Sequence, residues 1–545
     1  MAGFNLADLF ELVADAVPDR GAVVDPRRRL SYAELDARAN RLAAHLKKQG
    51  LAPGDHIGLQ LLNGSEYLEG MLAAFKLRAV PINVNYRYVE AELAYLFDDA
   101  DLVALIYSRQ FGSRVAAARE AVPKLQHLLV VDDGTQAQAA PDSGEYEAAL
   151  AAADPNRPPN TDRSGDDRYI AYTGGTTGMP KGVVWRQEDM FFAAMGGGDV
   201  YQSGNFIVTP AEIVERIPDV GGVTLTTPPL MHVSAQWGVY HALFSGGKVV
   251  FASGNFDAEQ IWRLVAEEKV NILTIVGDAM ARPLADAFTA SANADRPYEV
   301  SSLIVIGSGG AVLSTASKER FAQLLPNLMI VDGFGSSETG VVGNKMHVAG
   351  ADPGASPRFS VNAQTDVLDD AGRPVQRGSG AVGRLARRGH VPLGYYKDAE
   401  KTAATFLEVD GERWVLPGDL ATVDADGTVV LLGRGSQLIN TGGEKVYPEE
   451  VETVLRAHPD VFDVLVTGVP DDHWGQRVVA IVQPNPGASP TLGSIREHGR
   501  TALAGFKLPR ELVVVDRVER TPAGKADYRW ARRAAEQAGD SQRLE

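Results

Sequence analysis

The chain has 545 residues, of which 45% are hydrophobic and 23% are charged, and its formal net charge is −17. A chain of this length exceeds what one hydrophobic core supports, so it should form more than one domain, and its negative charge argues against a general nucleic-acid-binding protein, which needs a basic face. It has no cysteine, which excludes disulfides, a cysteine nucleophile and cysteine-ligated zinc, so that any thiol chemistry must come from a substrate.

Residues 1–20 mix acidic residues and leucine at helical spacing, and they lack the basic start and apolar centre of a secretion leader. No apolar run approaches the roughly 20 residues that a membrane span needs. We therefore expect a cytoplasmic protein without a transmembrane segment.

Helix and strand patterns alternate through most of the length. Ser31, followed by Glu34, predicts a capping box at the start of a helix. Such helical segments are separated by short apolar runs, which predict buried strands in α/β layers with parallel strands. The runs lie at residues 57–62, 80–85, 103–107, 128–131, 249–251, 272–276 and 303–306.

A second domain is expected after the glycine-containing connector at 433–437. The pattern restarts there, with a predicted helix at 448–458 and strands at 461–469, 478–482 and 512–515. About a hundred residues remain, which suffices for a small α+β domain. We therefore predict an α/β protein with a large N-terminal domain of layered α/β subdomains, residues 1–436, and a small α+β C-terminal domain, residues 437–545.

The most informative stretch runs from Tyr172 to Gly182 and is rich in glycine and threonine. Glycine lets the main chain approach a ligand closely, while hydroxyl and N–H groups form an anion cradle to which Lys181 adds a positive charge. The pattern is not a Walker A loop, because Pro180 precedes the lysine and Gly182 follows it. We expect a nucleoside triphosphate to bind here. The candidate residues are Thr173, Gly174, Gly175, Thr176, Thr177, Gly178 and Lys181.

This order of residues resembles the phosphate loop of the adenylate-forming superfamily, which includes acyl-CoA synthetases, peptide-synthetase adenylation domains and beetle luciferases. The family usually has Ser where this chain has Gly174, so one hydroxyl is missing. Further segments resemble family motifs in the family's order, and together they make the resemblance nearly full length. They lie at 229–238, 306–311, 332–340, 416–420, 438–452 and 520–525.

The resemblance implies a nucleotide and metal site. Phe334 would stack on adenine in place of the family's Tyr, and Glu338 would hold Mg²⁺, which takes one or two carboxylates together with phosphate oxygens and water. Asp419 would accept both ribose hydroxyls, with a second ribose contact from Arg434. The remaining nucleotide-binding residues that it implies are Gly309, Gly310, Ala311, Asp332, Gly333, Gly335, Ser336 and Ser337.

The resemblance also implies a mobile C-terminal domain that carries the catalytic lysine. Lys525 would bridge the carboxylate and the α-phosphate, where a preorganised cation offsets developing charge. Gly442 and Gly443 would flank the tunnel for the CoA pantetheine, and Gln437 stands where relatives have the Asp or Lys about which the domain turns. A lone histidine such as His232, beside the acyl pocket, is more often packed or gating than an acid or base. The catalytic candidates are Lys525, Glu338, Thr173 and His232.

The activity implied is that of an ATP-dependent acyl-CoA synthetase using ATP, Mg²⁺ and CoA. A carboxylate attacks the α-phosphate, giving acyl-adenylate and pyrophosphate; the small domain then turns, and the CoA thiol attacks the mixed anhydride. The residues at 185–189 and 439–445 are most similar to those of the actinobacterial FadD-type synthetases, some of which activate sterol side chains. Small residues near the expected pocket favour a medium-chain, long-chain or bulky acid. A homodimer is possible, and no nucleic-acid partner is expected.

Other functions share these motifs. An acyl-AMP ligase would load a carrier protein instead of CoA, and a peptide-synthetase adenylation domain is less expected because no carrier domain follows Lys525. A non-catalytic nucleotide sensor would bind ATP without releasing pyrophosphate. The presence of Lys181, Glu338, Asp419 and Lys525 argues against this function. A luciferase-like oxygenase would need an unusual substrate.

Overall fold

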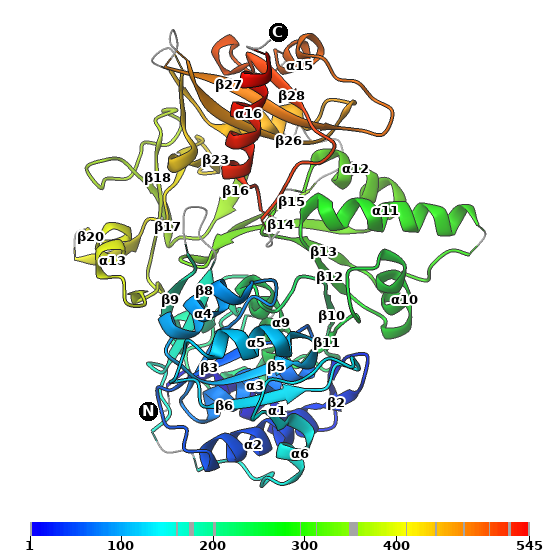
Figure 1. Ribbon diagram of the computed structural model, residues 1–545, viewed down its shortest axis with the longest axis vertical. Coiled ribbons are helices and arrows are strands. Elements are labelled where there is room, and N and C mark those ends of the chain that lie inside the picture. Colours follow the sequence, from blue (N-terminus) through cyan, green and yellow to red (C-terminus); the bar gives the residue numbers. More distant parts are fainter. Residues whose placement is uncertain are drawn as a thin grey trace.

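The computed structural model describes residues 3–159, 162–173, 179–199, 203–294, 296–311, 313–347, 358–409, 411–441, 444–471, 475–500, 502–521 and 525–542. A large N-terminal part carries a smaller C-terminal part at one end of the long axis (Figure 1). The described residues form a mixed α/β structure, which confirms the predicted fold class.

The first layer is an eight-stranded sheet with the order β19-β9-β8-β4-β3-β5-β6-β7 among the described residues. Its central strands pair in parallel, as the alternating pattern predicts, whereas β8 and β9 form an antiparallel hairpin around the glycine-rich stretch. The strands are β3 (His56–Gln60), β4 (Val80–Asn83), β5 (Leu102–Ser108), β6 (His127–Val131), β7 (Gly144–Glu145), β8 (Arg168–Thr173), β9 (Lys181–Arg186) and β19 (Gly394–Tyr395).

The second layer has 15 strands among the described residues: the strands from β1 to β14 in the sheet order pair in parallel, whereas the edge strand β2 and the strands beyond β14 pair antiparallel. Its order is β2-β1-β11-β10-β12-β13-β14-β15-β16-β23-β22-β18-β21-β20, with β17 paired to β18. The strands are β1 (Gly21–Val24), β2 (Arg29–Ser31), β10 (Val223–Thr226), β11 (Lys248–Val250), β12 (Ile272–Ile275), β13 (Val305–Ser308), β14 (Met329–Ser336), β15 (Gly340–Met346), β16 (Arg358–Val361), β17 (Thr365–Leu368), β18 (Gly383–Arg388), β20 (Phe406–Val409), β21 (Glu412–Val415), β22 (Asp419–Val423) and β23 (Val429–Arg434).

Helices cover these sheets, and α3 lies deepest because all 12 of its residues are buried. Its charged residues are paired: Glu69 with Arg38, and Lys76 with Glu11. The helices of this part are α1 (Leu6–Ala16), α2 (Tyr32–Lys48), α3 (Ser65–Lys76), α4 (Glu90–Asp99), α5 (Gly112–Arg119), α6 (Tyr146–Ala151), α7 (Gln187–Ala194), α8 (Glu212–Glu215), α9 (Val233–Phe244), α10 (Ala258–Glu268), α11 (Gly277–Asn293), α12 (Thr315–Leu324) and α13 (Ala399–Thr405).

The predicted capping box of α2 is present. The Glu34 N–H donates to the Ser31 hydroxyl at 3.2 Å, and the Ser31 N–H donates to the Glu34 carboxylate at 2.7 Å. One strand differs from its prediction: β13 runs over Val305–Ser308 instead of 303–306, so Gly307 lies within the strand. Leu303 and Ile304 are apolar, but they lie between the turn at 301–302 and the start of the strand.

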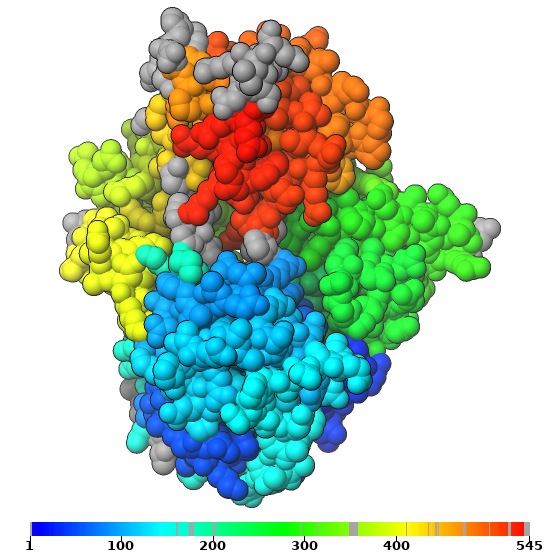
Figure 2. All heavy atoms as spheres, in the orientation of Figure 1, coloured from blue at the N-terminus to red at the C-terminus, as the bar shows by residue number. Residues whose placement is uncertain are grey.

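The small domain is a five-stranded sheet with helices, in agreement with the predicted α+β pattern. Figure 2 shows it, in orange and red, seated against the large domain. Its elements are β24 (Ile439–Thr441), β25 (Glu444–Val446), α14 (Pro448–Leu455), β26 (Val461–Asp471), β27 (Gly475–Pro484), α15 (Leu492–Gly499), β28 (Glu511–Val514) and α16 (Tyr528–Gln542). No helix among the described residues is both long and apolar enough to cross a membrane.

The junction between the domains depends on a glycine. Gly433 has φ +110°, and a Cβ added there would lie 2.0 Å from a carboxylate oxygen of Glu449 on α14. A side chain at this position would therefore strain the backbone and would require the Glu449 carboxylate to move.

A second contact joins α11 to β26. The Arg282 guanidinium donates to the Phe462 carbonyl oxygen at 2.8 Å and lies 4.6 Å from the centre of the Phe462 ring. A hydrogen bond and a cation–π contact together stabilise this domain arrangement by roughly 1–2 kcal/mol.

We predict that Arg282→Ala shifts the distribution of distances between the domains. Because the chain has no cysteine, dyes placed on Gln136→Cys and Ser489→Cys, both exposed positions, would report this distance by single-molecule energy transfer. Arg263→Ala on the exposed face of α10 is the control and should leave the distribution unchanged. Identical distributions for the Arg282 variant and the unchanged protein would contradict a stabilising role for this contact.

Candidate active site

The glycine-rich stretch lies at the open end of the β8–β9 hairpin. Thr173 ends β8 and pairs with Lys181, which begins β9. The loop residues Gly174, Gly175, Thr176, Thr177 and Gly178 lie outside the described residues. The Lys181 ammonium contacts the carboxylate of Asp398, which precedes α13. The two ends of the predicted phosphate loop are therefore fixed by strand pairing, and its cation is paired with an acid far along the chain.

The predicted adenine segments lie side by side at the ends of parallel strands. Ser308 at the end of β13 pairs with Asp332 on β14. Beyond them, a Cβ on Gly309 would lie 3.6 Å from the Gly333 carbonyl oxygen, and a Cβ on Gly310 would meet no atom within 4 Å. The main chain is thus open to a flat ligand at the carboxyl edge of the sheet, where α/β proteins bind ligands.

Asp332 is held by an ion pair with Lys318 of α12. Burial raises the pKa of Asp332, and the neighbouring Lys318 opposes this rise. The half-buried Phe334 ring packs on Phe359 with ring centres 5.2 Å apart. One side of this ring is therefore occupied by protein, and adenine stacking on the other side stays a prediction.

The turn that carries Glu338 is anchored on both sides. Tyr395 donates a hydrogen bond to Glu338 Oε1 at 2.9 Å, and the Trp185 indole N–H donates to the Ser337 carbonyl oxygen at 3.0 Å. The Ser336 N–H donates to the Thr339 hydroxyl at 2.9 Å. Gly335 is required here, because a Cβ on it would lie 2.1 Å from the Gly340 carbonyl oxygen.

Arg387 binds the backbone of the same turn. Its guanidinium donates to the carbonyl oxygens of Thr339 and Val341, the latter at 2.6 Å. Burial lowers the pKa of Arg387 to about 10. Trp185 and Arg387 bind backbone carbonyl oxygens of the short segment that presents Ser337 and Glu338, and Tyr395 binds the Glu338 side chain.

The predicted ribose residue Asp419 is 9% exposed and begins β22, where it pairs across the ladder with Arg434 of β23. The backbones of Asp419 and Arg434 are therefore neighbours, whereas the Arg434 side chain lies outside what the structure describes, and the ribose contacts of both residues stay predictions. Gly418, which precedes the aspartate, has φ +98°, a conformation that glycine adopts without strain. Gly442 and Gly443 also lie outside the described residues.

Lys525 and His232 come together from the two domains. Burial, and after it the positive charges of Lys525 and Arg87, lower the pKa of His232 to about 4. His232 precedes α9 as its N-cap residue. The exposed Lys525 accepts a hydrogen bond on its carbonyl oxygen from the Thr521 N–H at 2.8 Å. At neutral pH the imidazole is uncharged, which does not suit it to act as a proton donor.

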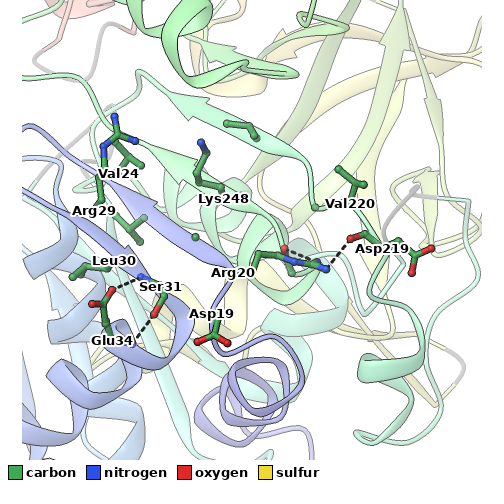
Figure 3. Close-up of a pocket in the computed structure, with 15 residues that line it drawn as sticks. Asp19, Arg20, Val24, Arg29, Leu30, Ser31, Glu34, Asp219, Val220 and Lys248 are labelled. Atoms are coloured by element: carbon green, nitrogen blue, oxygen red, sulfur yellow. Dashed lines mark hydrogen bonds between the residues drawn. The ribbon is translucent and has the colours of Figure 1, made fainter.

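A cavity of about 1140 Å³ lies between the domains. His232 and Ala311 of the large domain line it together with Arg520 and Thr521, which lead to Lys525. A second hollow, of about 610 Å³, lies beside β1, β2 and β11 and contains none of the predicted site residues (Figure 3). Its Arg20 donates to the carbonyl oxygens of Asp219 and Gly246, so this cation serves the fold.

Metal binding in this site would depend on Glu338. Among the residues that the structure describes, no group of three or more His, Cys, Asp or Glu side chains is placed to hold a metal ion. Mg²⁺ can be bound by a single carboxylate together with phosphate oxygens and water. Glu338 therefore fits a magnesium ion that arrives with the nucleotide.

Comparison with known proteins identifies the family. The model described as "AMP-binding enzyme" matches residues 10–396, and the model described as "AMP-binding enzyme C-terminal domain" matches residues 450–525. The chain belongs to the AMP-binding enzyme family. This result confirms the resemblance inferred from the motifs.

Individual relatives extend over nearly the whole chain. A 3-oxocholest-4-en-26-oate–CoA ligase from Rhodococcus rhodochrous is 48% identical over 531 residues, which are 97% of this chain and 95% of the relative. A medium/long-chain-fatty-acid–CoA/3-oxocholest-4-en-26-oate–CoA ligase from Mycobacterium marinum is 47% identical, covering 98% and 96%. The predicted enzyme class, an AMP-forming acid–thiol ligase, is confirmed by these likenesses.

The crystal structure of the anthranilate CoA ligase AuaEII in complex with anthranoyl-AMP has the same fold. Its TM-score is 0.84 at 23% identity, with 99% of each chain covered. At this identity the likeness concerns the fold, which has a large N-terminal and a smaller C-terminal domain.

Several residues around the site were missed from the sequence: Tyr395, Asp398, Arg387, Trp185 and Lys318. Only Asp398 had a local signal, because its side chain caps α13 by accepting from the Lys401 N–H at 2.9 Å. The others act through contacts between distant segments, which residue spacing does not reveal.

We predict that Lys525→Ala raises the pKa of His232, because it removes the larger of the two neighbouring positive charges. The pKa should stay below the usual 6.5, since burial is the largest cause of the shift. Carbon-13 labelling of the imidazole Cε1 atoms, with His232→Asn to assign the signal, measures this pKa by NMR. Lys507→Ala in the same small domain is the control. An unchanged pKa in Lys525→Ala would contradict the proximity of the two residues.

Proposed function

We propose that the chain joins a carboxylic acid to CoA at the expense of ATP, forming AMP and pyrophosphate through an acyl-adenylate. The observation that supports this proposal is the electrostatic effect of Lys525, from the small domain, on His232, which lines the cavity between the domains. Lys525 would supply a cation to this cavity, and the open glycine backbone at the ends of β13 and β14 would receive the nucleotide.

In the first half-reaction, the carboxylate attacks the α-phosphate and pyrophosphate leaves. Lys525 would contact both the carboxylate and the α-phosphate, and would stabilise the charge that accumulates as they join. Lys181, Thr173 and the loop between them would hold the β- and γ-phosphates. Glu338 would hold Mg²⁺, which supplies neutralising charge to the phosphates. Neutral His232 would line the acyl side and help to exclude water.

In the second half-reaction, the CoA thiol attacks the acyl carbon and AMP leaves. For this step we propose that the small domain, residues 437–545, turns relative to residues 1–436 near Gln437. The nearness of Glu449 to Gly433 supports a preferred arrangement of the domains. The positive φ of Gly433 is a conformation that glycine can leave and adopt readily, which supports a change of backbone dihedral angles at this junction. Gly442 and Gly443 would then flank the pantetheine.

We propose a bulky or medium/long-chain acid, such as a sterol side-chain carboxylate, as the substrate. The names of the two relatives support this choice, as does the open space at Gly307 and Gly310, where an added Cβ would meet no atom within 4 Å. A cytoplasmic location and a homodimer are further parts of the proposal, which fractionation and gel filtration test.

We predict that Lys525→Ala reduces adenylate formation by roughly 10²–10³-fold, the size typical of losing a preorganised charge in the transition state. Thioester formation from preformed acyl-AMP should change far less. Burst measurements of pyrophosphate and of acyl-CoA separate the two steps, with Lys507→Ala as the control. Equal losses in both half-reactions would refute the assignment.

The acceptor and the acid are identified by pyrophosphate release across a panel of acids, from acetate to long-chain and sterol acids, each with and without CoA. We expect release that requires a large acid and turns over repeatedly only with CoA. Turnover independent of CoA would favour a carrier-linked ligase, and acceptance of acetate alone would contradict the bulky substrate. ATP binding without release for every acid would favour a nucleotide sensor.

A further inference from the structure

One short segment contacts both charged side chains of the proposed Mg·ATP site. Strand β19 pairs with β9, directly beside the phosphate loop. From it, Tyr395 donates a hydrogen bond to Glu338, and three residues later Asp398 pairs with Lys181. The segment thus provides internal partners for the carboxylate and for the ammonium that the proposed function assigns to metal and phosphate.

The two carboxylate oxygens of Asp398 have different partners. Oδ1 accepts from the Lys401 N–H at 2.9 Å and caps α13, whereas Oδ2 contacts the Lys181 ammonium. The segment is fixed further by Thr402, whose hydroxyl donates to the Asp398 carbonyl oxygen at 2.7 Å and accepts from the Tyr395 N–H at 2.9 Å. Asp398 is therefore held in place, and it would not follow Lys181 if the lysine moved.

The lysine has freedom to move. Its side chain is 39% exposed and that of Asp398 is 23% exposed, so water screens the pair and holds it weakly. The hydrogen bond from Lys181 lowers the pKa of Asp398, so the acid is charged at neutral pH. A triphosphate carries more negative charge than one carboxylate and would draw the lysine away from this acid.

We propose that Asp398 is the exchange partner of Lys181. The carboxylate holds the ammonium in the nucleotide-free enzyme, yields it when ATP binds, and takes it back as pyrophosphate leaves. This inference rests on the proposed function. Asp398 is a positioning residue that acts through Lys181, and its competition lowers the affinity for ATP and for pyrophosphate by similar factors.

The test is Asp398→Asn, because asparagine keeps the N-cap and removes the charge. We expect ATP to bind about 2–5-fold more tightly in calorimetric titration with Mg²⁺, because the substitution removes a weak competing ion pair. The inhibition constant of pyrophosphate should fall by a similar factor for the same reason. A merely structural role predicts the opposite, since damage to the segment would weaken binding. Weaker or unchanged binding would overturn the proposal.

Two controls make the result specific. Asp257→Asn changes the corresponding N-cap of α10, where the aspartate accepts from the Glu259 and Gln260 N–H groups, and it should leave both constants unchanged. In a Lys181→Ala background, Asp398→Asn should have no further effect on ATP affinity. Equal tightening in both backgrounds would show that the carboxylate repels phosphate directly and would overturn the exchange.

Failure of this inference can be distinguished from failure of the proposed function. ATP titration requires no acid and no catalysis, so it measures the exchange alone. Pyrophosphate release by the unchanged enzyme, which needs an acid, measures the function. Release without the expected change in Asp398→Asn would overturn only the exchange.

Discussion

Cleavage of a triphosphate requires cations that offset its charge, and the cations proposed for this step come from separate parts of the chain. Lys181 begins β9 in the large domain, whereas Lys525 belongs to the small domain and lowers the pKa of His232. The domain contact through Arg282 and Phe462 holds this arrangement. In the proposed mechanism, the position of the small domain therefore determines whether Lys525 is present at the site.

The rest of the site is a framework that keeps short, irregular segments in place. Glycines at 309, 310 and 333 leave the backbone open but contribute little packing of their own. Their surroundings supply the order instead: the buried Arg387 and Trp185 bind carbonyl oxygens of the turn around Glu338. An uncharged residue in place of Arg387 would leave these carbonyl oxygens without their buried donor, at a cost of about 1–3 kcal/mol.

Much of the fold follows from local pattern. Many of the parallel strands, such as β3 to β6, were predictable because they are short apolar runs between helices, whereas β10 and β14 were not predicted. The small domain was predictable because its pattern restarts after Gln437. The antiparallel strands from β15 to β23 were not predictable from local pattern, since several are short and polar. Strand β18, for example, contains three arginines, at positions 384, 387 and 388. Such strands are specified by neighbours in the sheet, and residue periodicity alone does not show them.

The candidate site divides in the same way. The motif residues were located by resemblance, and the structure brings Thr173 to Lys181, Ser308 to Asp332, and Asp419 to Arg434 as strand neighbours. The pairing of Lys181 with Asp398 spans 217 positions, and no spacing rule predicts a contact over that distance. The residues that hold the motif side chains could therefore be identified only from the structure, whereas the motifs themselves could be identified from the sequence.

The most direct test of this account is a crystal structure with a non-hydrolysable acyl-adenylate analogue. We expect the adenine beside Gly309 and Gly333, the linker between acyl group and ribose within hydrogen-bonding distance of Lys525, and the acyl group beside His232. An analogue bound elsewhere, for example in the hollow lined by Arg20 and Lys248, or bound with Lys525 remote from it, would contradict the assignment of the cavity between the domains as the active site.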